Sequence, residues 1–424
     1  MQVRRVGTLF ARGRRTVAAA LRQLGRHAAT NFSRSPHGLS RARWSALEVS
    51  RRRLHLRVRT LVAVGGELTV VIAATLERRW GRRLTRRRHA REPLASRQHR
   101  SVAASGWRWL VLTPVMTPPW TPRPWALPVL SGPAPTPEVS RRWGRRHKTV
   151  PQRARQRILV VRRWLPGVEL TGSGDHTYSV HDRGGACARW GVRLLAPRRL
   201  EAALYAPAPP RRPDTTGRPR VKGKRLPQLK PVLKEAPTIG PRGRVRWDNG
   251  RRRELDVTSG TAVWYRLGQP VLPGRWVIVR APRGQRDPRA YVSTGPSARP
   301  RDLVRRVVHR GTIETTVEES RAHLGLETQR QWSDRAMARP TPCLVGLDAG
   351  VARLAHALPP DGKIPVRRTA CYHQAPATCG EVLAGVRQPF WGALRDSPSA
   401  HDPDLGDIPW ADRSRLAQAV CDSH

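Results

Sequence analysis

The sequence contains few acidic residues, few lysines and no paired cysteines. Only 30 of its 424 residues are Asp or Glu, whereas 80 are Lys or Arg, and just six of those 80 are lysines. The five cysteines lack any Cys-x-x-Cys spacing, which argues against a disulfide framework and against a ribbon-type zinc site. No apolar run approaches the roughly 18 residues of a membrane helix, and no secretory signal is evident. We therefore expect a cytoplasmic protein with no membrane partner.

The abundant charged residue is arginine, and the formal net charge is +50. The planar guanidinium group suits phosphate oxygens, so nucleic acid is the expected partner and the nucleoid the expected location. A GC-rich genome offers another explanation, because its codons enrich Arg, Pro, Ala, Gly and Trp in any protein. The charge alone leaves both explanations open.

Short-range patterns predict elements in the first half of the chain. Residues 1–60 combine arginines with helical periodicity, which predicts a basic helical DNA-binding domain; a basic surface that reads no sequence is the alternative. A β-branched run over 68–72 predicts a buried strand, with 107–112 as its neighbour. Prolines and tryptophans predict that 113–137 has no regular structure. A basic helix is expected over 141–163, ending at Leu165-Pro166-Gly167.

The second half begins with a basic segment rich in proline and glycine, residues 206–235. Such a segment is expected to pack no core but to lie along phosphates, with a solvated linker as the alternative. Residues 245–295 alternate between apolar runs and turns, which predicts strands. The tail, 396–424, is expected to be disordered.

A carboxylate lies on a basic helix face in the region 310–325. Arg310, Glu314, Glu318 and Arg321 are spaced so that all four project from one side of a helix. Ile313, Val317 and Leu324 form an adjacent apolar stripe that can pack on a core, and Gly325 is a suitable stop. By spacing alone, an ordinary solvated ion pair is the favoured explanation of this face.

The same region resembles a family signature. Val307-x-x-Arg310-x-x-x-Glu314, followed by Arg321, is similar to the Tyr-x-x-Arg-x-x-x-Glu-(x)6-Lys/Arg motif of bacterial insertion-sequence transposases of the DDE class. The match over 321–334 is almost letter for letter, and the resemblance extends from about residue 15 to 391. It implies an α/β fold like ribonuclease H: a mixed sheet flanked by helices, a small N-terminal helical domain, and a β-rich insertion before the last catalytic helix.

The implied ranges are 1–60 for the DNA-binding domain, 61–200 for the first part of the catalytic domain, 201–300 for the basic linker and insertion, and 301–395 for the catalytic helix and C-terminal helices.

The resemblance also implies three carboxylates that bind two Mg²⁺ (or Mn²⁺) ions. Glu314 matches the third position. Asp175, which follows the Arg162–Gly167 motif, matches the second, although a turn aspartate after Ser-Gly is the alternative. At the first position this chain has Ala73 and Ala74 where relatives have aspartate, and the nearby Glu77 falls on the family's own glutamate position. We therefore expect strand cleavage to be impaired.

The partner implied by the resemblance is double-stranded DNA, at the terminal inverted repeats of a mobile element, bound by a homodimer. The residues expected to contact DNA are Arg310, Arg321, Arg218, Arg220, Lys222, Lys224 and Arg225. The leading hypothesis is a DDE transposase that cuts and rejoins DNA, with this copy impaired. The alternatives are a catalytically inactive transposase-derived DNA-binding protein or repressor, a structural RNA-binding protein, and a relic that does not fold.

Overall fold

The computed structural model describes most of the chain. It leaves out residue 1 and the positions 27–29, 31, 33, 64, 80–83, 86–87, 92–102, 180, 212–215, 236–242, 247–251, 282–286, 329–333, 358–363, 367, 370–371, 374–375, 396–409 and 422–424. The second half of the motif over 321–334 therefore lies largely outside the described residues.

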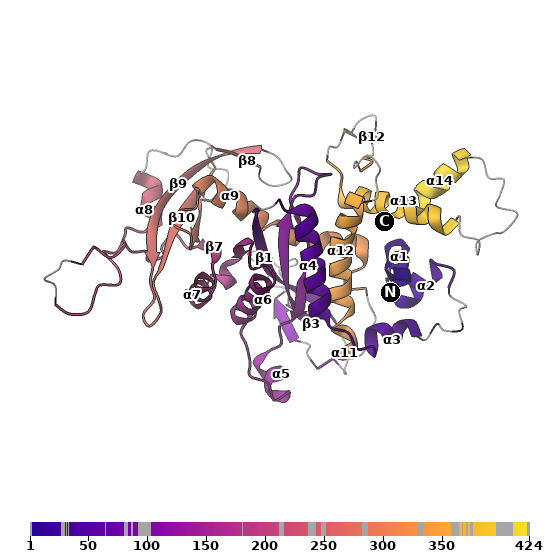
Figure 1. Cartoon of the computed structure of the whole chain (residues 1–424), viewed down its shortest axis with the longest axis horizontal. Helices are drawn as coiled ribbons and strands as arrows, with labels where there is room; N and C mark the ends of the chain where they lie inside the picture. Colours follow the sequence, from indigo (N-terminus) through magenta and orange to yellow (C-terminus); the bar gives the residue numbers. More distant parts are fainter. Residues whose placement is uncertain are drawn as a thin grey trace.

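A mixed β-sheet forms the centre of the molecule (Figure 1). Five of its strands are β1 (Glu67–Arg78), β3 (Ala103–Met116), β5 (Leu130–Pro133), β6 (Glu169–Gly174) and β7 (Val192–Arg198). They have the order β5-β3-β1-β6-β7; β1 pairs antiparallel with β3 and parallel with β6, and β6 pairs parallel with β7. Two crossover helices, α6 (Val150–Trp164) and α7 (His181–Arg189), make these parallel pairs possible.

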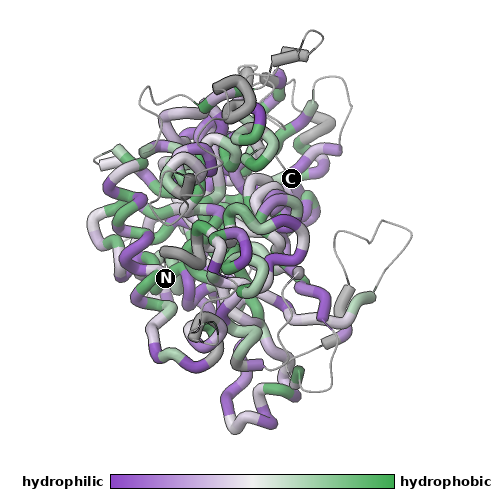
Figure 2. The backbone as a smooth tube through the Cα atoms, turned by 90° about the vertical axis from the view of Figure 1, so that its right-hand side faces the viewer, coloured by the Kyte–Doolittle hydropathy of each residue, from purple (hydrophilic) through white to green (hydrophobic). Residues whose placement is uncertain are grey.

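Helices cover both faces of this sheet, as predicted. They include α4 (Ala46–Leu61), α6, α10 (Thr312–Leu324) and α12 (Pro340–Ala357). Side chains of β1 alternate between two cores: Val70 and Ile72 pack with Ile158 of α6, whereas Val71 packs with Ile313 of α10. Figure 2 shows hydrophobic segments running through the middle of the molecule. The predicted mixed α/β class is confirmed.

The predicted β-rich insertion is present and extends the same sheet. β11 (Arg289–Ser293) pairs with β7, and the sheet continues through β10 (Leu272–Arg280), β9 (Arg252–Trp264) and β8 (Gly243–Arg246). Helix α9 (Pro300–His309) packs Leu303 against it, and α8 (Leu229–Glu235) packs Leu229 beside Ile278. The burial of Leu229 shows that the segment 206–235 does contribute to a small core, contrary to the sequence expectation.

Two local predictions were wrong. The helix expected over 141–163 is split into α5 (Pro137–Arg142) and α6, because Gly144 has a left-handed φ of 59° and Thr149 caps a new helix through a capping box. Its stop at Leu165 is confirmed. The segment 113–137 was expected to lack regular structure, yet β4 (Trp125–Ala126) and β5 lie there; both pair with the outer edge of β3.

The two ends of the chain meet beside α13 (Cys379–Arg395), on the right of Figure 1. The buried Arg387 of α13 donates to the Leu9 carbonyl of α1 (Gln2–Phe10) and to the Cys421 carbonyl of α14 (Trp410–Cys421), both at 2.8 Å. The prediction of a disordered tail over 396–424 is therefore wrong for 410–421, where this hydrogen bond anchors a helix. The remaining elements are α2 (Val17–Arg22), α3 (Arg34–Ser40), β2 (Arg88–Arg91), a 3-10 turn (His176–Tyr178), α11 (Asp334–Met337), β12 (Arg368–Thr369) and β13 (Tyr372–His373).

Among the described residues, no helix has both the length and the apolar character needed to cross a membrane.

Candidate functional site

The first and second predicted carboxylate positions lie on adjacent strands. β1 and β6 run parallel, with Ile72 opposite Gly174. Asp175 follows with an extended backbone, φ −77° and ψ −173°. The register, continued by one residue, therefore brings Asp175 opposite Ala73. The sheet therefore places Asp175, the predicted second carboxylate, beside the predicted first position.

Side-chain alternation distinguishes the two alanines that the sequence could not separate. Ala73 packs in the core that contains Ile313 of α10, the helix that carries Glu314. Ala74 packs in the opposite core, with Ile158 of α6. Only Ala73 therefore faces the side of the sheet that is covered by α10, the helix of the predicted third carboxylate.

The alternation of β6, continued by one residue through the extended backbone of Asp175, assigns Asp175 to the same side as Ala73. Gly172 and Gly174, which alternate with it, face the opposite core: a Cβ added to Gly172 would lie 3.2 Å from Ile158 of α6, and one added to Gly174 would lie 2.8 Å from Tyr178 of the 3-10 turn. This crowding explains why glycines occupy these two strand positions. Asp175 also caps the 3-10 turn, because its Oδ1 accepts a 2.8 Å hydrogen bond from the Thr177 amide. It is thus a turn residue as well as a candidate ligand.

A buried arginine lies behind Asp175. The guanidinium of Arg183 on α7 sits 5.6 Å from the centre of the Tyr178 ring and is almost fully buried. Burial lowers the pKa of Arg183 to about 10, while Cys187, Tyr178 and Asp175 act in the opposite direction. Burial also raises the pKa of Tyr178. Asp175 therefore has a positive charge beneath it.

Glu314 lies in the first turn of α10 and is exposed. Its Oε1 accepts a 2.6 Å hydrogen bond from Nη2 of Arg310. The four charged residues do not share one continuous helix, because α9 ends at His309 and α10 begins at Thr312. The apolar stripe does pack as predicted: Ile313 and Leu324 are buried, and Gly325 ends the helix with a left-handed φ of 65°.

Arg321, expected to contact DNA, makes contacts inside the protein. Its Nη2 and Nε donate to Oε1 of Glu327, at 2.6 and 2.8 Å, and Nη2 also donates to Thr75 Oγ1 at 3.1 Å and to the Leu76 carbonyl at 3.3 Å. Glu327 has a φ of 74°, in the left-handed region. Arg321 thus ties α10 to β1, a few residues beyond Ala73.

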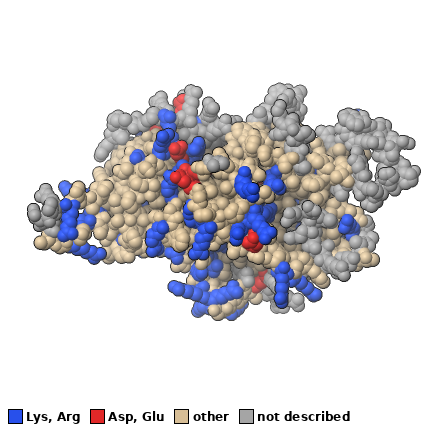
Figure 3. Space-filling view, viewed as in Figure 1, with Lys and Arg blue, Asp and Glu red and all other residues tan. Residues whose placement is uncertain are grey.

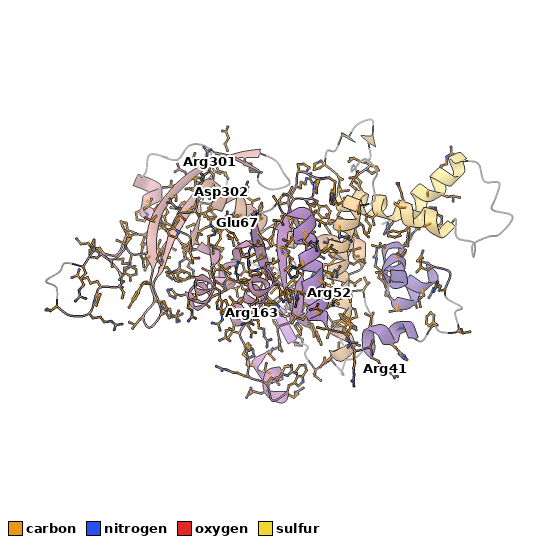
Figure 4. All side chains as sticks on the ribbon, in the orientation of Figure 1. Arg41, Arg52, Glu67, Arg163, Arg301 and Asp302 are labelled. Atoms are coloured by element: carbon orange, nitrogen blue, oxygen red, sulfur yellow. The ribbon has the colours of Figure 1, made fainter. Side chains whose placement is uncertain are left out.

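A glutamate at the start of β1, Glu67, holds α9 against the sheet. Glu67 contacts Arg306 of α9, and it lies 3.2 Å from Arg193 Nη2 and 2.5 Å from Thr171 Oγ1. Figure 4 labels Glu67 just below α9. No sequence pattern predicts this contact, because Glu67 and Arg306 lie 239 residues apart.

The residues present do not fit a two-metal centre. Such a centre needs three converging carboxylates, and Ala73 supplies a methyl group at the first position. Within the described part of the chain, no group of three or more His, Cys, Asp or Glu side chains is arranged to hold a metal ion. Glu77 is no substitute, because its side chain is buried in hydrogen bonds to Trp109, Thr341 and Arg79.

The predicted DNA-contacting residues outside α10 lie on a segment that we call the basic strap, residues 216–230. Five of its cations are exposed: Arg218, Arg220, Lys224, Arg225 and Lys230. Lys222 is different, because its ammonium lies over two tyrosine rings. The sequence did not predict this contact, since Tyr205 and Tyr265 lie well before and well after Lys222 in the chain. In Figure 3, basic side chains gather at the left-hand end of the molecule, where Figure 1 draws the loop that precedes α8.

One comparison with known proteins shows a family for this chain. A family model described as DDE superfamily endonuclease matches residues 1–254. Among solved structures, the cryo-EM structure of a piggyBac transposase synaptic complex with hairpin DNA is similar, with a TM-score of 0.38 and 10% sequence identity. That alignment covers 82% of this chain and 56% of that chain, so this chain spans little more than half of that transposase. No curated protein matches the sequence.

Proposed function

We propose that this chain, which belongs to the superfamily of DDE endonucleases, is a transposase-type DNA-binding protein whose strand-cleavage centre lacks its first carboxylate. The observation that supports the proposal is the position of Ala73, opposite Asp175 in register and in one core with the helix of Glu314. Endonucleases of this superfamily generally use a divalent metal ion. Asp175 and Glu314 are the two carboxylates that would hold Mg²⁺ or Mn²⁺ if a third were supplied.

The proposed partner is duplex DNA, at the terminal inverted repeats of an insertion sequence, bound by a homodimer at the nucleoid. The net charge of +50 supports an anionic partner. A protein that binds such ends without cutting them competes with active copies of the enzyme, so a repressor role is the second candidate. The missing carboxylate at Ala73 favours it.

Restoring the carboxylate tests the proposal. Duplex DNA from the regions that flank the gene is incubated with Mg²⁺ or Mn²⁺ and with the parent, Ala73→Asp or Ala74→Asp. We expect nicking by Ala73→Asp alone, because only position 73 faces Asp175 and α10. Adding Asp175→Asn or Glu314→Gln to Ala73→Asp serves as the matched control and is expected to abolish nicking again.

Two results would contradict this assignment. One is a parent protein that nicks as fast as Ala73→Asp. The other is an Ala73→Asp variant that binds the DNA as tightly as the parent yet never cuts it. The repressor role predicts a metal-independent gel shift by the parent that weakens steeply with salt.

A further inference from the structure

We propose that Tyr205, Lys222 and Tyr265 form a clamp that fastens the basic strap to the edge of β9, and that the fastened strap binds the phosphate backbone of duplex DNA. The choice of DNA as the anion rests on the proposed function, whereas the clamp rests on the structure alone. Lys222 is then a positioning residue, and its exposed neighbours make the contacts to phosphate.

The strap is attached to the sheet by backbone hydrogen bonds. Tyr205 exchanges two with Val263 of β9, at 3.1 and 2.7 Å. The strap pairs in turn with the segment around Tyr205: the Ala206 amide donates to the Lys224 carbonyl at 2.9 Å, and the Gly223 amide donates to the Ala206 carbonyl at 2.8 Å. A Cβ at Gly223 would lie 2.4 Å from the carbonyl oxygen of Pro207, so glycine permits this close approach.

The clamp closes over Lys222. Its Nζ lies 3.7 Å from the centre of the Tyr205 ring and 4.0 Å from the centre of the Tyr265 ring. The two rings meet edge to face, with centres 5.9 Å apart and planes at 83°. A cation held against two aromatic faces is attracted to both of them. Lys222 is half-buried there, whereas Lys224, two residues on, is exposed.

The charges left outside the clamp have one sign. Arg218, Arg220, Lys224 and Arg225 are exposed, and no Asp or Glu occurs between 216 and 230. Backbone pairing and the clamp hold these cations in a fixed arrangement. A preordered array loses less conformational entropy on binding than a free loop does. The uncharged tyrosine rings should therefore contribute to affinity for a polyanion, and because phosphates carry no sequence information the binding should tolerate many DNA sequences.

The test measures DNA affinity of the full chain in EDTA, by fluorescence anisotropy over a series of KCl concentrations. The variants are Lys222→Met, Tyr205→Leu/Tyr265→Leu and the triple combination, and Tyr205→Phe/Tyr265→Phe keeps both rings as a control. Lys224→Met is the matched control for Lys222→Met, because it removes the same charge from an exposed neighbour. Circular dichroism and a thermal scan show that each variant folds.

If the clamp acts as proposed, Lys222→Met and the double leucine variant raise the dissociation constant for DNA by similar factors. The dissociation constant of the triple variant is within about twofold of either, because all three variants release the same strap. The double phenylalanine variant matches the parent. Lys224→Met lowers the salt slope by about 0.9, as expected for one lost phosphate contact, and adds to the effect of the leucine substitutions.

The proposal is overturned if the leucine substitutions leave the dissociation constant and the salt slope unchanged. It is equally overturned if Lys222→Met and Lys224→Met behave alike and both add to the leucine substitutions, since Lys222 would then contact phosphate directly. Duplex RNA that competes as well as duplex DNA would overturn the choice of partner. Because no cleavage is measured, a failure of Ala73→Asp to nick DNA would not affect these results.

Discussion

The indole Nε1 of Trp109 donates a 2.5 Å hydrogen bond to Oε2 of Glu77, from β3 to its neighbour β1. Thr341 of α12 donates to the same oxygen at 2.8 Å, and Arg79 donates to Oε1 at 2.5 Å. Glu77 is 2% exposed. Both of its oxygens are thus used inside the protein, which explains why it cannot replace the carboxylate missing at position 73.

Replacing this carboxylate should destabilise the fold without changing DNA affinity. Glu77→Gln removes the charge that balances the largely buried guanidinium of Arg79. We expect the free energy of unfolding, measured by urea denaturation, to fall by about 3 kcal/mol. Glu138→Gln is the matched control, because the Glu138–Arg142 pair is exposed and should contribute almost nothing. Equal stability of the two variants would contradict the structural role of Glu77.

Arg321 offers a choice between two roles. The resemblance predicts a DNA contact, whereas the structure places its guanidinium against Glu327 and Thr75. If the internal role dominates, Arg321→Ala lowers the free energy of unfolding by about 1–3 kcal/mol, because Glu327 loses a charged partner. Thermal denaturation without DNA measures this directly. Unchanged stability together with weaker DNA binding would instead support the role predicted from the sequence.

The buried guanidinium of Arg183 predicts a stabilising substitution. None of its three nitrogens hydrogen-bonds to a described residue. A buried charge without hydrogen bonds costs several kcal/mol, so an apolar side chain of similar length should be favourable. We expect Arg183→Met to raise the free energy of unfolding by about 1–4 kcal/mol. A lower melting temperature for this variant would show that the charge beneath Asp175 is needed by the fold.

Asp348 of α12 predicts a pH dependence. The pKa of its carboxyl is raised from 3.8 to about 7, chiefly by burial, with Arg57 lowering it and Glu319 raising it. Between about pH 4 and pH 7 the folded state keeps a proton on Asp348 that the unfolded chain releases. The contribution of Asp348 to the free energy of unfolding therefore falls as the pH rises through this range and is constant above about pH 7. Asp348→Asn should remove this slope. The melting temperature of the variant should equal that of the parent near pH 4 and exceed it at pH 8. If variant and parent have the same melting temperature at both pH values, the raised pKa of Asp348 is refuted.

The sequence predicted those features that local patterns determine. The β-branched run of β1, the apolar stripe of α10 and the stop at Gly325 all follow from periodicity or from the freedom of glycine at positive φ. β5 was missed because its neighbouring prolines mark a loop, although an edge strand needs only some of its amides for pairing.

The candidate site was harder to predict from the sequence than the fold, for a physical reason. Asp175 and Glu314 were identified only through the resemblance. The choice between Ala73 and Ala74 depends on register and side-chain alternation, which no short stretch of sequence specifies. The Lys222 clamp and the Glu67–Arg306 contact join segments far apart in the chain, so their geometry appears only once the sheet is assembled.

The most direct test of the central claim is Mn²⁺ binding, measured by electron paramagnetic resonance on the parent, Ala73→Asp and Ala74→Asp. Since only position 73 faces Asp175 and the helix of Glu314, Ala73→Asp should bind Mn²⁺ more tightly than the parent, and Ala74→Asp should not. Tight binding by the parent, or a gain in Ala74→Asp equal to that of Ala73→Asp, would contradict the assignment of Ala73 as the missing carboxylate.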